Sequence, residues 1–238
     1  MESLKGKVAL ITGAGSGIGR AIAIEMAKEG VNIGLLGRRH NPIENVAAEV
    51  ANLGVNSTSA IADVSKLDEV NIAVAKIIEE LGTVDILINN AGIASFGSFL
   101  ELSPDEWINM ININLVGAYY TTRAILPNMM KKMSGDIVNI ASTAALKPAP
   151  MTSAYSASKA GMMAMSESLM LEARKYNIRV SCLNPSTVAT EMARDLQLTG
   201  ENTERVMQPE DFAEFVISNL KLSRHLFIRE ASIWSTNP

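Results

Sequence analysis

Short apolar runs alternate with helical segments along the whole chain, and this alternation constrains the fold more than any other feature. Runs rich in Val, Ile and Leu recur as KVALIT, VNIGLLG, STSAIAD, VDILINN, DIVNIAS, IRVSCLNP and, less cleanly, HLFIREASIW. Such runs are typical of strands that are buried on both faces. Segments of helical period lie between them, at 18–28, 42–53, 66–81, 104–132, 153–176 and 209–220. The pattern predicts one doubly wound α/β domain, in which helices cover both faces of about seven parallel strands.

Length and charge narrow the class of protein further. A chain of 238 residues with 47% hydrophobic and 19% charged residues suits one globular domain, spanning 1–238, rather than a coiled coil or a disordered chain. The net charge of −4 and the scattered basic residues offer no field for nucleic acid. Polar residues at the start lead directly into a strand pattern, and no apolar run reaches about 18 residues. We therefore expect no signal peptide, no membrane span and a cytoplasmic location.

The cysteine and histidines predict neither a disulfide nor a metal site. Cys182 is the single cysteine and lies inside a predicted buried strand, so we expect a packed thiol rather than a nucleophile. His40 and His225 are far apart in the sequence and match no ligand spacing. We therefore expect no bound metal.

A glycine-rich turn, ITGAGSGIGRAIA, follows the first predicted strand and opens the first predicted helix. In a doubly wound fold, glycines here let the backbone turn sharply and approach a pyrophosphate, which helix N–H groups then bind. The spacing is not the familiar G-x-G-x-x-G, and a tight loop without a ligand is the alternative. The residues of the turn are Thr12, Gly13, Gly15, Ser16, Gly17, Ile18 and Gly19.

The end of the second predicted strand, LLGRRH, bears on which nicotinamide cofactor would bind. An acidic residue at this place bonds the ribose 2′-hydroxyl of NAD, whereas an arginine accommodates the 2′-phosphate of NADP. Arg38 and Arg39 stand there, and the nearest carboxylate, Glu44, lies in the next predicted helix. Because the guanidinium fork binds phosphate with two parallel hydrogen bonds, we predict NADP(H) rather than NAD(H). The alternative is that both arginines only solvate a loop.

Tyr155 and Lys159, in the stretch SAYSASKAG, are four residues apart in a predicted helix. Residues at i and i+4 share one helix face, with Cβ atoms roughly 5 to 6 Å apart, so the phenol and the ammonium are expected to be neighbours. A free phenol has a pKa of about 10, and we expect the ammonium to lower it by favouring the phenolate. Ser142 ends the fifth predicted strand, and open α/β sheets bind ligands at such carboxyl ends.

In type, order and spacing, these motifs resemble the short-chain dehydrogenase/reductase family. They include the glycine turn, an Asn-Asn-Ala-Gly sequence after the fourth predicted strand, and Ser142 followed by Tyr155-x-x-x-Lys159. The resemblance covers nearly the whole chain and weakens after Met192. It implies a Rossmann fold and a nicotinamide cofactor. It also implies that Tyr155 protonates a carbonyl oxygen, that Ser142 binds that oxygen, and that Lys159 holds the nicotinamide ribose.

The resemblance implies further roles for individual residues. Asn114 would be a catalytic residue that positions a water linking Lys159 to solvent; its alternative is a polar group that faces the core or an interface. Ser186 replaces the usual glycine after the sixth strand, which leaves open whether the backbone there adopts the conformation that glycine permits. The remaining residues expected to contact the cofactor are Asp63, Val64, Asn90, Gly92, Pro185, Val188 and Thr190.

Within the family, the chain looks most like bacterial 3-oxoacyl-acyl-carrier-protein reductases and related carbonyl reductases. This resemblance implies NADP(H)-dependent reduction of a 3-oxoacyl thioester, as in fatty acid metabolism. The chain ends in REASIWSTNP and lacks the Asp-Gly-Gly segment near which many such enzymes end. Reduction of another small ketone, or oxidation of an alcohol, is therefore the alternative. A catalytically idle NADP(H) sensor or scaffold is the alternative from another class, against which the intact Ser142, Tyr155 and Lys159 argue.

Two further expectations concern the segment 189–207 and the assembly. The polarity of this segment and its Gly200 favour a mobile substrate flap, and a plain surface loop with a short helix is the equal alternative. The family resemblance implies a homotetramer or dimer, built through the helices that start near Pro104 and Ser153.

Overall fold

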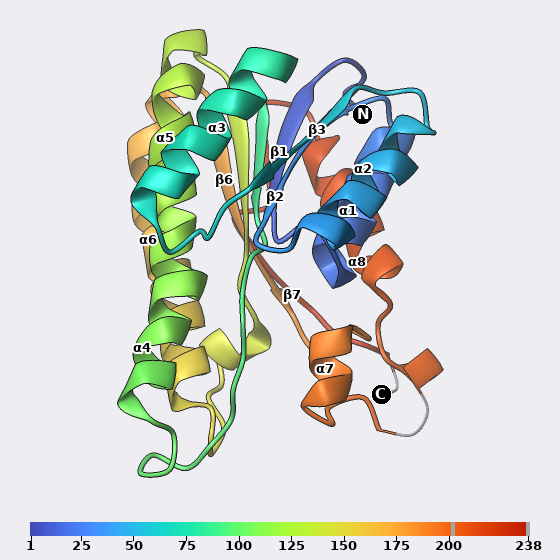
Figure 1. Ribbon diagram of the computed structural model, residues 1–238. Coiled ribbons are helices and arrows are strands. Elements are labelled where there is room, and N and C mark those ends of the chain that lie inside the picture. Colours follow the sequence, from blue (N-terminus) through green and yellow to red (C-terminus); the bar gives the residue numbers. More distant parts are fainter. Residues whose placement is uncertain (201–202, 237–238) are drawn as a thin grey trace.

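One parallel sheet forms the centre of the computed structural model, which describes residues 1–200 and 203–236 (Figure 1). Its seven strands have the order β3-β2-β1-β4-β5-β6-β7. The order reverses between β1 and β4, so the predicted doubly wound fold is confirmed. The strands are β1 Val8–Thr12, β2 Asn32–Gly37, β3 Ser57–Ile61, β4 Ile86–Asn89, β5 Gly135–Ile140, β6 Ile178–Pro185 and β7 Glu230–Ile233.

Helices form a layer on each face of this sheet (Figure 1). One layer consists of α1 Gly17–Lys28, α2 His40–Ala51 and α8 Pro209–Leu220. The other consists of α3 Leu67–Leu81, α4 Pro104–Ile111, α5 Gly117–Lys132 and α6 Ser153–Ala173. None of the helices within the described residues is both long and apolar enough to cross a membrane.

The strand β1 shows why the sequence is apolar at four successive positions, Val8 to Ile11. Ala9 and Ile11 pack into the core under α1, α2 and α8, whereas Val8 and Leu10 pack into the core under α3 and α5. Because successive side chains of a strand point to opposite faces, a strand between two helical layers buries all of them. The continuous apolar runs therefore correctly predicted a sheet with a layer of helices on each face.

Most element boundaries differ from the sequence prediction by one or two residues, and larger differences occur in three places. The helix predicted over 104–132 is interrupted by a π-helical turn, η1 Asn112–Val116, which joins α4 to α5. The α6 helix ends at Ala173, and a 3-10 turn, η3 Arg174–Tyr176, completes the predicted segment. The last strand is shorter than HLFIREASIW because only Glu230–Ile233 pairs with β6.

The predicted flap, 189–207, contains a short helix, α7 Glu191–Asp195, and a 3-10 turn, η4 Thr203–Arg205. A bridge between Val188 and Met207 joins the two ends of the segment. Residues 201–202 of the predicted flap lie outside the described residues. The short helix agrees with the loop alternative, and mobility of the segment stays a prediction.

Candidate active site

A cleft of about 820 Å³ lies at the carboxyl ends of the strands. Loops that follow β1 to β6 line it, because parallel strands all end at this edge of the sheet. The glycine turn and the tyrosine–lysine pair are thus brought to one cavity. The sequence-predicted residues that line the cleft are Gly13, Gly15, Ser16, Gly17, Ile18, Arg38, Arg39, Val64, Asn90, Gly92, Ser142, Tyr155, Lys159, Pro185, Val188 and Thr190.

Four predicted site residues do not line the cleft, and two of them, Thr12 and Gly19, lie behind the glycine turn. The Thr12 hydroxyl is buried and accepts the N–H groups of Asn90 and Ala91, each at 3.0 Å. A Cβ atom on Gly19 would lie 2.4 Å from the carbonyl oxygen of Gly13. Both residues shape the turn from behind, so the structure does not place them at the cofactor face that the sequence predicted. The other two are Asp63 and Asn114.

The backbone of the glycine turn adopts conformations that favour glycine. Gly13 has a φ of 64° and Gly17 a φ of 52°, both in the left-handed region. A Cβ atom on Gly13 would also lie 2.8 Å from the Cα atom of Ala91. Ser16 is the N-cap of α1, yet its side chain makes no capping hydrogen bond. Because the first N–H groups of α1 lack a side-chain cap, the turn fits a pyrophosphate.

Arg38 and Arg39 line the cleft from the end of β2, and both are exposed. Within the described residues, neither guanidinium has an ion pair or a hydrogen bond. Partial burial raises the pKa of the nearby Asp63 carboxyl, but hydrogen bonds from Ser65 and the charge of Arg38 outweigh it and lower that pKa. Two free guanidinium groups at this place fit the 2′-phosphate of NADP(H).

Ser142, Tyr155 and Lys159 meet at one wall of the cleft. Ser142 precedes a 3-10 turn, η2 Thr143–Ala145, and its hydroxyl accepts the Ala144 N–H at 3.1 Å. A side-chain hydrogen bond joins Ser142 to Tyr155. The Lys159 ammonium lies 5.8 Å from the centre of the Tyr155 ring and donates to the Ile140 carbonyl oxygen at 2.8 Å. The predicted proximity of the phenol and the ammonium on α6 is confirmed.

Burial determines the protonation of both groups. Desolvation raises the pKa of the Tyr155 phenol, and the hydrogen bond with Ser142 opposes this only in part. The predicted lowering of this pKa by Lys159 is therefore wrong for this structure. Desolvation also lowers the pKa of Lys159 to about 8, although the Cys182 thiol opposes it. Both groups are shifted towards their neutral forms, because a charge away from water is unfavourable.

Asn114 lies in the π-helical turn η1, and its side chain is 0% exposed. Its amide oxygen accepts the Ile93 N–H at 2.8 Å. Its amide nitrogen donates to the Ile93 carbonyl oxygen at 2.9 Å and to the Ser158 hydroxyl at 3.0 Å. The side chain therefore ties the loop after β4 to α6, which agrees with the alternative of a core-facing polar group. A water positioned by Asn114 stays a prediction.

The segment after β6 lines the cleft without backbone strain. Ser186 is not among the residues with positive φ, so the position needs no glycine. The Thr190 hydroxyl accepts the Ala193 N–H at 3.2 Å and caps α7. Pro185 and Val188 lie on either side of this serine in sequence and also line the cleft. The question that Ser186 left open is thus answered by the backbone.

Sequence reasoning missed the apolar wall beside Tyr155. Phe96, in the loop between β4 and α4, contacts the Tyr155 ring edge-on, with centroids 6.0 Å apart. Met192, Leu196 and Leu198 line the cleft from the predicted flap. No signal in the sequence identified these residues, because loop positions follow no hydrophobic period. The cleft therefore has an apolar side next to the phenol.

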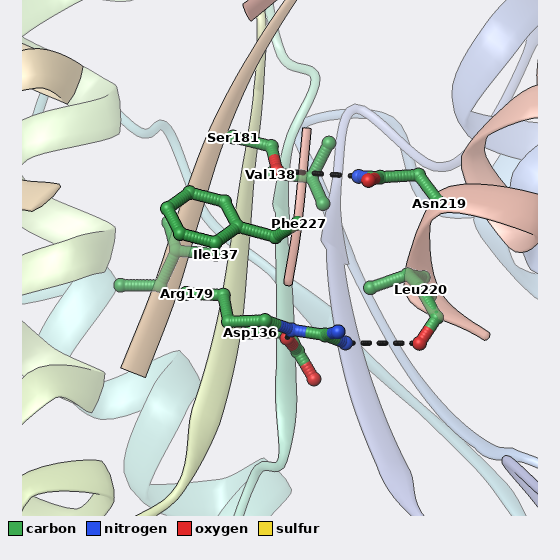
Figure 2. A pocket seen from close by; sticks show the side chains of 8 residues that line it. All are labelled: Asp136, Ile137, Val138, Arg179, Ser181, Asn219, Leu220 and Phe227. Atoms are coloured by element: carbon green, nitrogen blue, oxygen red, sulfur yellow. Dashed lines mark hydrogen bonds and ion pairs between the residues drawn. The ribbon is translucent and has the colours of Figure 1, made fainter. Parts of the chain in front are cut away.

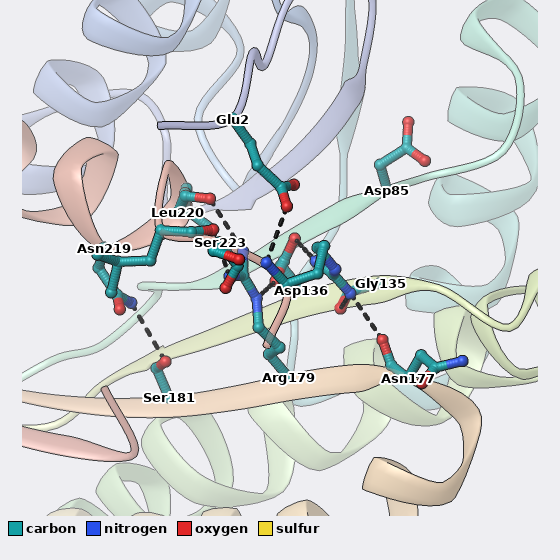
Figure 3. A network of polar contacts seen from close by, with 12 residues as sticks. Glu2, Asp85, Gly135, Asp136, Asn177, Arg179, Ser181, Asn219, Leu220 and Ser223 are labelled. Atoms are coloured by element: carbon teal, nitrogen blue, oxygen red, sulfur yellow. Dashed lines mark hydrogen bonds and ion pairs between the residues drawn. The ribbon is translucent and has the colours of Figure 1, made fainter. Parts of the chain in front are cut away.

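A second polar cluster lies at the opposite, amino ends of β5 and β6 (Figure 3). Asp136 accepts hydrogen bonds from Arg179 at 2.5 Å and from Arg224 at 2.7 Å. Arg179 also donates to the carbonyl oxygen of Leu220 at 2.9 Å, as Figure 2 shows, and to that of Leu222 at 2.9 Å, and so caps the end of α8. No group of three or more His, Cys, Asp or Glu in the described part of the chain is arranged to hold a metal ion.

Comparison with known proteins identifies a family and several relatives. The family model described as short chain dehydrogenase matches residues 7–200. An "uncharacterized oxidoreductase" of Staphylococcus saprophyticus is 35% identical over 234 residues, which are 98% of this chain and 99% of that protein. The 3-oxoacyl-[acyl-carrier-protein] reductase of Chlamydia muridarum is 35% identical over 218 residues, which are 88% of each chain.

Among solved structures of similar fold, one contains an NADP derivative and another contains NAD+. An alcohol dehydrogenase from the archaeon Thermococcus sibiricus, complexed with 5-hydroxy-NADP, is 30% identical with a TM-score of 0.89 over 97% of each chain. An NAD+-bound xylitol dehydrogenase is 27% identical with a TM-score of 0.90, over 98% of this chain and 100% of that chain.

Proposed function

The chain belongs to the short-chain dehydrogenase family, and we propose that it is an NADP(H)-dependent enzyme that reduces a carbonyl group to a hydroxyl. One observation supports this proposal above the others: Ser142, Tyr155 and Lys159 line the same cleft as the glycine turn at the start of α1. NADPH, when bound, supplies a hydride. The residues of the chain bind and orient the carbonyl and supply the proton.

In the proposed mechanism, Tyr155 donates its hydroxyl proton to the carbonyl oxygen. The phenol, whose pKa burial raises, is protonated at neutral pH and can donate this proton. Ser142 donates a hydrogen bond to the same oxygen and fixes its direction. The Lys159 ammonium, which lies 5.8 Å from the centre of the phenol ring, would hold the nicotinamide ribose beside the carbonyl.

The preference for NADP(H) over NAD(H) rests on Arg38 and Arg39. Both line the cleft, and neither makes a hydrogen bond or an ion pair within the described residues, so their fork-shaped donors are available to a 2′-phosphate. Because a protein of similar fold binds NAD+, the KM values for NADPH and NADH have to be compared directly. We expect a KM for NADPH at least about tenfold below that for NADH, which corresponds to one charge-assisted hydrogen bond. A lower KM for NADH would overturn this part of the proposal.

A 3-oxoacyl thioester is the proposed substrate. The relative from Chlamydia muridarum acts on that class by its name, and the apolar wall of Phe96, Met192 and Leu196 suits an acyl chain. The test is a panel of 3-oxoacyl thioesters of increasing length and simple ketones of matched size, followed by NADPH absorbance. Turnover of ketones alone would replace the thioester with another carbonyl. NADPH binding without oxidation of the cofactor by any substrate would favour a sensor.

Assembly, location and the flap complete the proposal. Exposed apolar side chains on α4, α5 and α6, namely Ile108, Tyr119 and Leu171, suit a homo-oligomer, which we expect to be a tetramer. Light scattering tests this, and a monomer would contradict it.

We also propose a cytoplasmic location and closure of 189–207 over the substrate. Closure predicts slower hydrogen exchange in this segment with cofactor and product bound, and unchanged exchange would contradict it.

A further inference from the structure

A buried polar network lies in the sheet beneath the cleft, and the mechanism above uses none of its members. Asn89 ends β4, Asn139 lies in β5, and the two are opposite each other in the ladder. Asn89 is 2% exposed and Asn139 is 0% exposed. The amide nitrogen of Asn89 donates to the amide oxygen of Asn139 at 2.8 Å. This pair joins the two central strands through side chains as well as through the backbone.

The network extends from this pair into two helices. Towards α5, Thr121 donates to the Asn89 amide oxygen at 2.5 Å, and Thr122 accepts from its amide nitrogen at 2.9 Å. Towards α6, the amide nitrogen of Asn139 donates to the Ser166 hydroxyl at 2.8 Å. Ser166 in turn donates to the carbonyl oxygen of Met162 at 2.6 Å. The bonds fix both helices to the same two strands.

The part of the network in α6, Ser166 and Met162, lies on the same face of the helix as the reacting groups. Tyr155, Lys159, Met162 and Ser166 follow one another at intervals of four, three and four residues, so they form one stripe of α6. On the strand side, Asn139 precedes Ile140, whose carbonyl oxygen accepts from Lys159 at 2.8 Å. The strand and the helix joined by Asn139 and Ser166 are therefore those that bring Ser142 and Tyr155 together.

The C-terminal part of α6 joins the core that contains Ile137, Ile178 and Val180. Around Met162, the core between α6 and the strands β5 and β6 consists instead of small or flexible side chains, and methionine adapts to more than one arrangement. Buried hydrogen bonds are directional and can select one register. The members of this core are Leu115, Ala118, Ala141, Met162, Met163, Met165 and Cys182.

We propose that Asn139 and Ser166 are positioning residues, which set the place of the Tyr155 phenol relative to Ser142. The proposal rests on the proposed function, because it concerns the rate of the same proton transfer. Neither residue lines the cleft, so their effect on the reaction passes through the position of α6. Loss of the Asn139–Ser166 bond should therefore lower kcat more than it weakens NADPH binding.

The test compares Ser166→Ala with a matched control, Ser181→Ala. Both serines are 3% exposed, and each hydroxyl accepts from an asparagine amide. Ser166 accepts from Asn139 at 2.8 Å, and Ser181 accepts from Asn219 at 3.2 Å, the latter bond being drawn in Figure 2. Only Ser166 lies on α6. We expect Ser166→Ala to lower kcat roughly ten- to a hundredfold, as a small misplacement of reacting groups does. Ser181→Ala should leave kcat unchanged, and Ser166→Thr, which keeps the hydroxyl, should restore most of it.

A second readout needs no substrate. The chain has four tyrosines, so 3-fluorotyrosine labelling gives few 19F resonances, and Tyr155→Phe assigns the one of interest. This resonance should shift in Ser166→Ala and stay in place in Ser181→Ala. Equal kcat in the two variants together with an unshifted resonance would overturn the proposal. If the wild type reduces no carbonyl, the proposed function fails, while the 19F comparison still decides the positioning role. Should Ser166→Ala not fold, Ser166→Cys serves in both measurements, because a thiol fills the position and hydrogen-bonds more weakly than a hydroxyl.

Discussion

The two ends of β5 and β6 hold polar clusters whose bonding is opposite in kind. At the amino ends, Asp136 is bonded to two arginines, and Arg179 also bonds the last carbonyl groups of α8. At the carboxyl ends, burial raises the pKa of Tyr155 and lowers that of Lys159 to about 8. In the first cluster, the polar groups are hydrogen-bonded to other groups of the protein. The second keeps groups desolvated and available to a ligand, which is a feature of functional sites.

This difference has a thermodynamic consequence. Breaking a buried ion pair leaves an uncompensated charge, so the cluster of Asp136 and Arg179 should support the fold. A lysine desolvated in a cleft destabilises the folded state instead, and a ligand offsets that cost when it binds. Substitutions in the two clusters should therefore separate activity from stability.

The largest effect is expected for Tyr155→Phe. Without the phenolic hydroxyl no group supplies the proton, and kcat should fall by about 10² to 10⁴, the usual contribution of a general acid. NADPH binding, measured by fluorescence, should be largely unchanged, as should the unfolding temperature. Activity near that of the wild type would contradict the assignment of Tyr155 as proton donor.

Arg179→Met should have the largest effect on stability. It leaves the buried Asp136 with Arg224 alone and removes the bonds to the end of α8, so the free energy of unfolding should fall by about 3 to 5 kcal/mol. Urea unfolding measures this loss, and kcat of the folded enzyme should not change. Arg229→Met is the control, since its pair with Glu167 is exposed on both sides and should contribute less than about 1 kcal/mol. Equal losses in the two variants would contradict the structural role of Asp136 and Arg179.

Lys159→Met should lower activity and NADPH affinity while it stabilises the cofactor-free protein. The pKa of Lys159 falls from 10.5 to about 8, so at pH 7 its charge destabilises the folded state by about 3 kcal/mol. Loss of its bond to the Ile140 carbonyl oxygen costs about 1 kcal/mol. A net gain of about 1 to 2 kcal/mol should appear in urea unfolding without cofactor. A loss of stability would show that the buried ammonium supports the fold.

Lys159 also imposes a pH dependence on stability. Above a folded-state pKa of about 8, the native protein has lost this proton while the unfolded chain retains it up to about 10.5. Because the unfolded state then binds more protons, stability should rise with pH from about 8 to about 10. Above that, the raised pKa of Tyr155 acts in the opposite direction. The difference between wild type and Lys159→Met isolates this slope, and a difference independent of pH would contradict it.

Residues that belong to a sequence motif or to one helix face were predictable from the sequence, whereas contacts that depend on tertiary packing were not. The i to i+4 spacing placed Tyr155 beside Lys159, because a helix has one geometry. The pKa of Tyr155 depends on burial by Phe96 and by the α4 side chains Trp107 and Met110, and no period in the sequence predicts these contacts, so its direction was predicted wrongly. The network of Asn89 was not predicted for a related reason. The sequence alone does not indicate that Asn89 of β4 lies opposite Asn139 of β5.

The sheet itself followed from its apolar runs, but the π-helical turn at Asn114 did not. A helical period continues through 104–132, and only the contacts of Asn114 with Ile93 and Ser158 show why the helix changes there. Thr12 and Gly19 show the same limit on a smaller scale. Their motif indicated the turn correctly, while the side of the turn on which each lies depended on packing against Asn90 and Gly13.

Hydride transfer to a carbonyl, with Tyr155 as the proton donor, is tested most directly with NADPH deuterated at both C4 positions. Mass spectrometry of the products from the thioester and ketone panel should show an alcohol with one deuterium on the carbinol carbon. Wild-type protein and Ser181→Ala should form it, and Tyr155→Phe should not. NADPH binding without a deuterated product from any carbonyl, or equal product formation by Tyr155→Phe, would contradict the account.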